Sequence, residues 1–161
     1  MTPTFLAGTS RPPAASTVRV KICGLRSLEH AVAALDAGAD FLGFNFAPVS
    51  KRRVDAGVAR RAIEACRALP GERLRTTDGG MVGIFVNQPP AVVEGLARAC
   101  ALDMIQLSGD EDAAYCREIS LRTGLPVIKA VRLGGVDDAA RVAAYTGDGG
   151  VTAILADAPV A

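Results

Sequence analysis

The sequence predicts an α/β fold, specifically a (β/α)8 TIM-type barrel of which only about six βα units are present in this chain. Six short apolar runs alternate with alanine-rich stretches that repeat apolar residues at helical spacing. Most of the runs begin a little over twenty residues apart, and this regularity favours a barrel of right-handed βαβ units. A doubly wound open sheet is the alternative. Against it, the first βα turn, residues 23–27, lacks the G-x-G-x-x-G loop of a dinucleotide-binding fold.

Each predicted element has its own sequence pattern. Ser27 and Asp137 are expected to cap helices, Gly38 and Gly124 to end them, and residues 70–80 to form a polar loop. The strands are expected at residues 18–23, 41–46, 81–86, 104–107, 127–131 and 151–155. The helices are expected at residues 27–37, 56–69, 91–101, 113–123 and 137–145.

The number of units sets the expected domain organisation. A closed barrel of this type has eight strands and typically about 250 residues. We therefore expect residues 1–17 to be a flexible leader and residues 18–161 to be a barrel domain that is incomplete at its C-terminal end. A fragment and a naturally truncated product both fit this pattern. The loops after strands seven and eight frequently build the phosphate site of such barrels.

Composition excludes several function classes. The formal net charge is +1 with acids and bases interspersed, which gives no electrostatic basis for binding nucleic acid or a membrane surface. The four cysteines, Cys23, Cys66, Cys100 and Cys116, form no C-x-x-C pair, and His30 is the only histidine, so no metal site is expected. Free thiols are typical of a reducing compartment, and the leader has no signal-peptide pattern, so we expect a cytoplasmic protein.

Candidate catalytic residues close the strands, because barrel active sites lie at the carboxyl ends of the strands. Lys21 and Cys23 are two residues apart on the first strand and therefore share a face, where the ammonium would favour the thiolate. Cys23 alone would be interpreted as a small buried hydrophobe, but a lysine in an apolar strand needs a carboxylate or solvent. Asp157 ends the sixth strand, where it could act as a general acid or cap the next helix.

Two further basic positions are candidates for substrate binding. Arg52 lies in a basic cluster after the second strand, which is either a solvated loop or a bidentate clamp for a carboxylate. Lys129 lies in the apolar fifth strand, and its structural alternative is an ion pair inside the barrel. His30 lies in the first helix next to Glu29 and is expected to be a surface residue without a role.

Taken together, these segments resemble the phosphoribosylanthranilate isomerase family of tryptophan biosynthesis from residue 18 to the end of the chain. The motifs are K-I-C-G, S-x-R-x-V, V-G-x-F-V-N and Q-L-x-G-D-E, in this order and at this spacing. The resemblance implies a cofactor-free Amadori rearrangement of N-(5-phosphoribosyl)anthranilate, a small phosphorylated substrate. It also implies that Asp157 protonates the ring oxygen, that Cys23 removes the proton from the sugar C2, and that Arg52 holds the anthranilate carboxylate. Lys21, Gln106 and Lys129 complete the expected substrate-binding set.

The chain departs from the family pattern at two positions. Ser108 stands where the family usually has histidine in Q-L-H-G, and Ala156 replaces the usual leucine before the aspartate. Two other functions remain open at this stage. One is a different phosphosugar-binding barrel enzyme, although such synthases and epimerases usually place other acid and base residues on strands one and six. The other is a catalytically inactive truncated fragment of the isomerase.

Overall fold

The computed structural model describes residues 18–69, 80–135, 138–145 and 150–157. The expected leader, most of the polar loop and the expected cap Asp137 lie outside these residues. The elements within them, in chain order, are β1 (Lys21–Cys23), α1 (Leu28–Asp36), β2 (Phe41–Asn45), α2 (Ala56–Ala68), β3 (Gly80–Phe85), α3 (Pro90–Ala99), β4 (Met104–Leu107), α4 (Ala113–Thr123), β5 (Val127–Arg132), α5 (Asp138–Ala143) and β6 (Ala153–Asp157).

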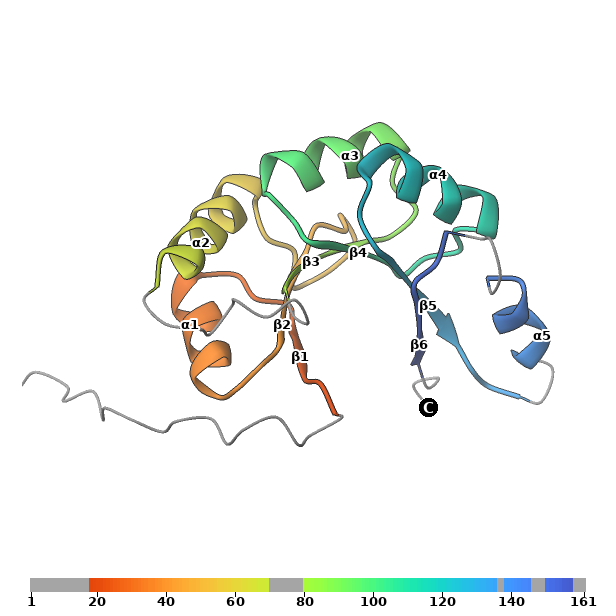
Figure 1. The fold of residues 1–161 in the computed structure, drawn as a ribbon, viewed down its shortest axis with the longest axis horizontal. Helices are drawn as coiled ribbons and strands as arrows, with labels where there is room; N and C mark the ends of the chain where they lie inside the picture. The colour runs from red at the N-terminus through yellow and green to blue at the C-terminus, as the bar shows by residue number, and fades with distance from the viewer. Residues whose placement is uncertain (1–17, 70–79, 136–137, 146–149, 158–161) are drawn as a thin grey trace, which may run out of the picture.

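The six strands within the described residues are all parallel and lie in the order β1-β2-β3-β4-β5-β6. The sheet curves, the helices form an arc on its convex side, and its concave side is open in Figure 1. This is the architecture of part of a (β/α)8 barrel, so the predicted fold class is confirmed. No helix in the part of the chain that the structure describes has the length and apolarity needed to cross a bilayer.

The register of the ladders assigns each strand residue to one of the two faces, because paired residues share a face and neighbours along a strand alternate. Cys23 pairs with Gly43, and Gln106 pairs with both Ile84 and Ile128. Followed across all five ladders, these pairs put Lys21, Cys23, Gln106 and Asp157 on the concave face. The opposite set of residues faces the helices.

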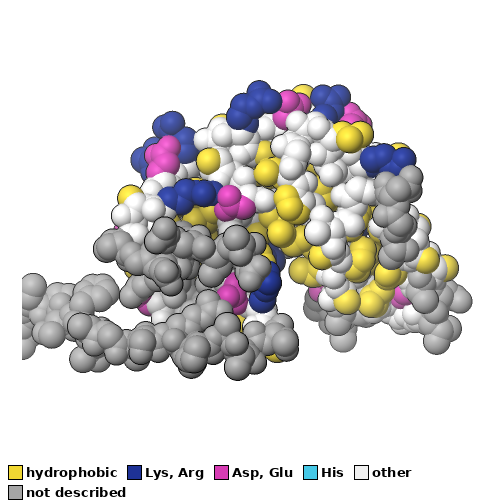
Figure 2. Space-filling view, in the orientation of Figure 1, with side chains coloured by type: hydrophobic (Ala, Val, Ile, Leu, Met, Phe, Trp, Pro, Cys, Tyr) yellow, Lys and Arg dark blue, Asp and Glu magenta, His cyan; other side chains and the backbone are white. Residues whose placement is uncertain are grey.

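The main core fills the space between the convex face and the helix layer. The strands contribute Leu42, Phe44, Met81, Phe85, Ile105, Leu107 and Val127, all nearly or fully buried. The helices meet them with small residues such as Ala31, Ala59 and Ala97, which let the backbones approach closely. Burial of each large side chain stabilises the fold by about 2–3 kcal/mol relative to exposure. The outer surface of the arc shows basic and acidic side chains interspersed (Figure 2).

Local signals set the helix ends. The Ser27 hydroxyl accepts a hydrogen bond from the backbone N–H of His30 at 3.3 Å, as expected of an N-cap. Gly124 follows α4 in the left-handed conformation with φ of 67°, which confirms its predicted role as the stop. His30 is exposed on α1, as expected.

The strand ends differ from the prediction where pairing decides them. β1 begins at Lys21 rather than at residue 18, and β6 is Ala153–Asp157 rather than 151–155. Ala153 pairs with Ile128 and Asp157 with Arg132, so the ladder with β5 carries β6 two residues further. Gly80, expected in the polar loop, is the first residue of β3 because it pairs with Phe41.

Candidate active site

A lysine and a cysteine meet at the carboxyl end of β1. The Lys21 ammonium donates to the Cys23 sulfur at 2.6 Å and to the side-chain oxygen of Gln106 at 2.6 Å. Lys21 and Cys23 are partly buried, and Gln106 is 6% exposed. The contact links β1 to β4 across the concave face. The pair places a positive charge directly against the sulfur of Cys23.

Glycines shape the surroundings of Cys23. A Cβ on Gly43, the partner of Cys23 on β2, would lie 3.2 Å from the Cys23 sulfur. Gly24 has φ of 82°, and a Cβ there would lie 2.7 Å from Cδ of Arg52. Both the backbone conformation and the arginine stem therefore require glycine at position 24.

Arg52 approaches the same strand end from the loop after β2. Its Nη1 donates to the backbone oxygen of Cys23 at 3.4 Å, while its backbone N–H donates to the Ser50 hydroxyl at 3.1 Å. The residue is exposed to solvent. This position suits an anion that binds beside Cys23.

Asp157 is the last residue of β6 and is exposed. It pairs with Arg132 at the carboxyl end of the sheet, and its backbone oxygen accepts from the N–H of Leu133 at 2.8 Å. It therefore lies on the concave face, at the same end of the sheet as Cys23 but on the opposite edge strand. The structure brings Lys21, Cys23, Arg52 and Gln106 into one cluster and places Asp157 across the concave face from it.

Lys129 lies on the other face of the sheet. It pairs with Leu107, which belongs to the core beneath the helices. Its side chain is 2% exposed, and its ammonium donates to Oε2 of Glu111 at 3.0 Å, to the backbone oxygen of Gly109 at 2.6 Å and to that of Leu107 at 3.4 Å. The alternative of an ion pair is therefore realised, but between the sheet and the helix layer rather than inside the barrel. The structure does not bring Lys129 together with the other candidate residues.

Glu111 is a residue to which the sequence analysis assigned no role. Its carboxylate also accepts from the backbone N–H of Asn87 and of Gly109, each at 2.8 Å. It thus ties together the loops that follow β3 and β4 and the Lys129 side chain from β5. An acidic residue in the Q-L-S-G-D-E motif, followed by a lysine in an apolar strand, was the available sequence signal.

The remaining thiols are buried in the core. Cys66, Cys100 and Cys116 are each at most 2% exposed, and all four cysteines are free. Burial raises the pKa of the Cys66 and Cys100 thiols, and it raises the pKa of Cys116 to about 11. Cys23 is thus the accessible thiol. Among the residues that the structure describes, no group of three or more His, Cys, Asp or Glu side chains could hold a metal ion.

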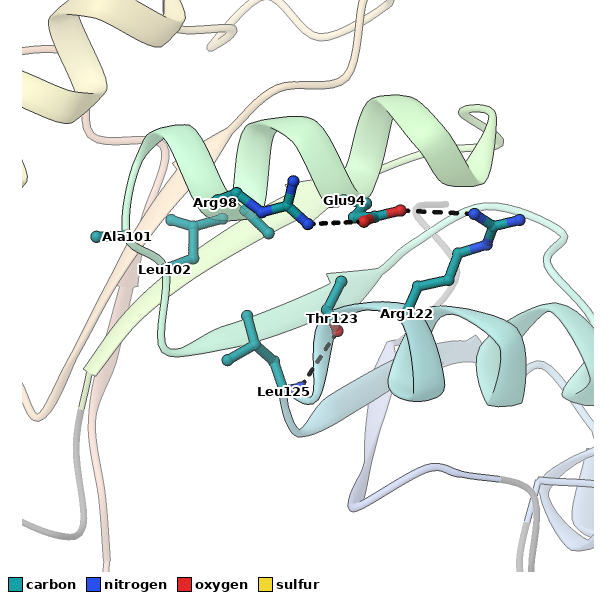
Figure 3. A pocket seen from close by; sticks show the side chains of 8 residues that line it. Glu94, Arg98, Ala101, Leu102, Arg122, Thr123 and Leu125 are labelled. Atoms are coloured by element: carbon teal, nitrogen blue, oxygen red, sulfur yellow. Dashed lines mark hydrogen bonds and ion pairs between the residues drawn. The ribbon is translucent and has the colours of Figure 1, made fainter.

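A pocket of about 220 Å³ lies away from this cluster, between the ends of α3 and α4 (Figure 3). In it, Glu94 accepts from Arg98 at 2.8 Å and from Arg122 at 3.5 Å. Leu102 and Leu125, which also line it, precede β4 and β5. The pocket therefore lies at the amino-terminal end of the strands, where barrels carry stability rather than catalysis.

Comparisons with known proteins agree with this fold. The family model of N-(5'-phosphoribosyl)anthranilate (PRA) isomerase matches residues 20–160. A protein of Myxococcus xanthus named N-(5'-phosphoribosyl)anthranilate isomerase is 40% identical over 141 residues, which cover 88% of this chain and 60% of that protein. The crystal structure of phosphoribosyl anthranilate isomerase from Thermotoga maritima superimposes with a TM-score of 0.76 at 36% identity, covering 90% of this chain and 63% of that one.

A second solved structure, of phosphoribosyl anthranilate isomerase in complex with reduced 1-(o-carboxyphenylamino)-1-deoxyribulose 5-phosphate, gives a TM-score of 0.74 at 36% identity. The match covers 89% of this chain and 66% of that chain. The chain thus spans less than two thirds of the length of these relatives. By the extent of the family match and its similarity to these relatives, the chain belongs to the N-(5'-phosphoribosyl)anthranilate isomerase family.

Proposed function

We propose that the concave site serves the Amadori rearrangement of N-(5-phosphoribosyl)anthranilate to 1-(2-carboxyphenylamino)-1-deoxyribulose 5-phosphate, a step of tryptophan biosynthesis. The observation that carries the proposal is the 2.6 Å contact between the Lys21 ammonium and the Cys23 sulfur at the carboxyl end of β1. A relative solved with the reduced product supports the substrate class. The four free cysteines fit a cytoplasmic enzyme.

The two steps of the rearrangement need an acid and a base. Asp157 donates a proton to the furanose ring oxygen as the anilino nitrogen expels it, which opens the ring to a Schiff base. The Cys23 thiolate then removes the proton from C2, and the resulting enolamine tautomerises to the ketone. Both groups end strands on the concave face, so a substrate lying across that face meets both of them.

The neighbouring cations bind and orient the substrate. Arg52 presents its exposed guanidinium beside Cys23 and pairs with the anthranilate carboxylate. Lys21 keeps the positive charge at the sulfur. Lys129, whose ammonium already meets three oxygens on the opposite face, supports the loops rather than the substrate.

The test is a fluorescence assay of the loss of phosphoribosylanthranilate, with the 161-residue chain and with a longer version that carries two further βα units. We expect Cys23→Ala and Asp157→Asn each to abolish turnover. Asp36→Asn, a matched change on α1, should leave turnover unchanged. Activity that survives both site substitutions would refute the assigned acid and base. A folded longer version without activity would refute the isomerase itself.

A further inference from the structure

The chemistry of Lys21 fixes the orientation of its neighbour on β4. A lysine ammonium only donates hydrogen bonds, so the amide of Gln106 must turn its oxygen toward Lys21. The amide nitrogen then points the other way, where it donates to the Ser108 hydroxyl at 2.9 Å. Both ends of this buried amide are therefore engaged, which leaves Gln106 one orientation.

These contacts form one hydrogen-bonded chain, Ser108–Gln106–Lys21–Cys23, with links of 2.9, 2.6 and 2.6 Å. We propose that Ser108 and Gln106 are positioning residues that hold the Lys21 ammonium against the Cys23 sulfur. A lysine side chain has several rotatable bonds and loses rotamer freedom when it is held in place. Gln106, itself held by Ser108, gives the Lys21 ammonium a fixed acceptor beside the one it has in the Cys23 sulfur. The positive charge therefore stays at the sulfur without a contribution from bound substrate.

Few charged groups face Cys23 in the part of the chain that the structure describes. The Lys21 ammonium comes from the same strand, and the Arg52 guanidinium comes from the loop after β2. The group from β4 is the neutral amide of Gln106, and Asp157 on β6 shares the concave face. Of the two cations, Lys21 is the one that contacts the sulfur itself.

The proposal can be tested without substrate, by alkylating the intact chain with iodoacetamide at a series of pH values. Mass spectrometry then gives the rate at each cysteine, and the three buried thiols report whether a variant stays folded. In Ser108→Ala, the pH of half-maximal Cys23 alkylation should rise by roughly half to one unit, the size of effect that one lost hydrogen bond produces. Ser108→Thr keeps the hydroxyl and should restore the original profile.

Gln106→Met breaks the same chain at a second point. We expect it to shift the Cys23 profile at least as far as Ser108→Ala, and the double variant to shift it no further than Gln106→Met alone. Ser120→Ala on α4 is a matched serine control that should leave the profile unchanged. An unshifted profile in both Ser108→Ala and Gln106→Met, with a clear shift in Lys21→Met, would overturn the proposal. It would show that the Lys21 ammonium stays at the sulfur without help from Ser108 and Gln106. An equal shift in Ser108→Thr would also overturn the proposal.

The inference rests on the proposed function only where it takes Cys23 as the catalytic base. Alkylation needs no turnover, so the two can fail separately. A chain with the expected alkylation profile but no isomerase activity would refute the function and leave the positioning role standing.

Discussion

The substitution Glu111→Gln removes a negative charge from the point where three loop and strand segments are tied together. The carboxylate of Glu111 accepts from Lys129 Nζ at 3.0 Å and from the backbone N–H groups of Asn87 and Gly109 at 2.8 Å each. The side chains of both ionic partners are 2% exposed. The change therefore leaves a lysine charge without its counter-ion in a place that water does not reach.

The size of the effect follows from this burial. Removing one partner of a buried ion pair typically costs 3–5 kcal/mol, because the remaining charge is desolvated and uncompensated. Glutamine keeps one acceptor oxygen, and Lys129 retains the Gly109 carbonyl at 2.6 Å, so we expect the lower end of the range, about 3 kcal/mol. That is a large part of the 5–15 kcal/mol by which domains are usually stable.

Urea unfolding at pH 7, followed by far-ultraviolet circular dichroism, measures this loss. Glu118→Gln is the matched control, because Glu118 contacts Arg122 at 2.7 Å but the side chains of both partners are nearly half exposed. Its unfolding midpoint should hardly move. Lys129→Met combined with Glu111→Gln should be less destabilised than the sum of the two single variants, since no unpaired charge remains. A midpoint for Glu111→Gln that matches the Glu118→Gln control would refute the reasoning.

Two other predictions concern glycine strain and alkaline pH. Gly24→Ala should displace Arg52 and lower the free energy of unfolding in urea by about 2 kcal/mol. Gly38→Ala should lower it by only about 1 kcal/mol, because Gly38 has a similar φ of 88° but a Cβ there would meet no atom within 4 Å. Equal losses in the two variants would contradict the role of Arg52. Because the folded-state pKa of Cys116 is raised to about 11, its contribution to stability is present below about pH 8.5 and is lost as the pH rises toward 11, amounting to about 3 kcal/mol. Urea midpoints measured from pH 7.5 to 10.5 should therefore fall, and should fall less in Cys116→Ala; a flat profile in the parent chain would show that burial does not hold this thiol neutral.

Most of the fold was predictable, because alternating apolar runs and amphipathic stretches mark βα units whatever their neighbours are. β4 was predicted at the residues where it occurs. The ends of β1 and β6 were wrong by two or three residues, since hydrophobicity locates a strand whereas hydrogen bonding to the adjacent strand decides where it stops.

The cluster around Cys23 was partly predictable, because the two-residue spacing of Lys21 and Cys23 on one strand places them on one face. The face of the sheet on which Lys129 lies could not be predicted. β5 carries apolar residues on both faces, Val127 on one and Ile128 on the other. Its sequence therefore does not tell which face turns toward the helices. The role of Glu111 also depends on contacts between loops that no local pattern reveals.

The strand order has a consequence for how the protein is made. Each strand from β2 to β6 hydrogen-bonds to the strand that precedes it in the chain. A ribosome therefore delivers every new strand to an edge that has already been synthesised, and none of these strands waits for later residues to find its first partner. At about 5–20 residues per second, a βα unit of this size takes on the order of seconds to emerge, which is long compared with the microseconds of helix and loop formation. The growing chain can thus bury its apolar surface one unit at a time while it is still attached to the ribosome.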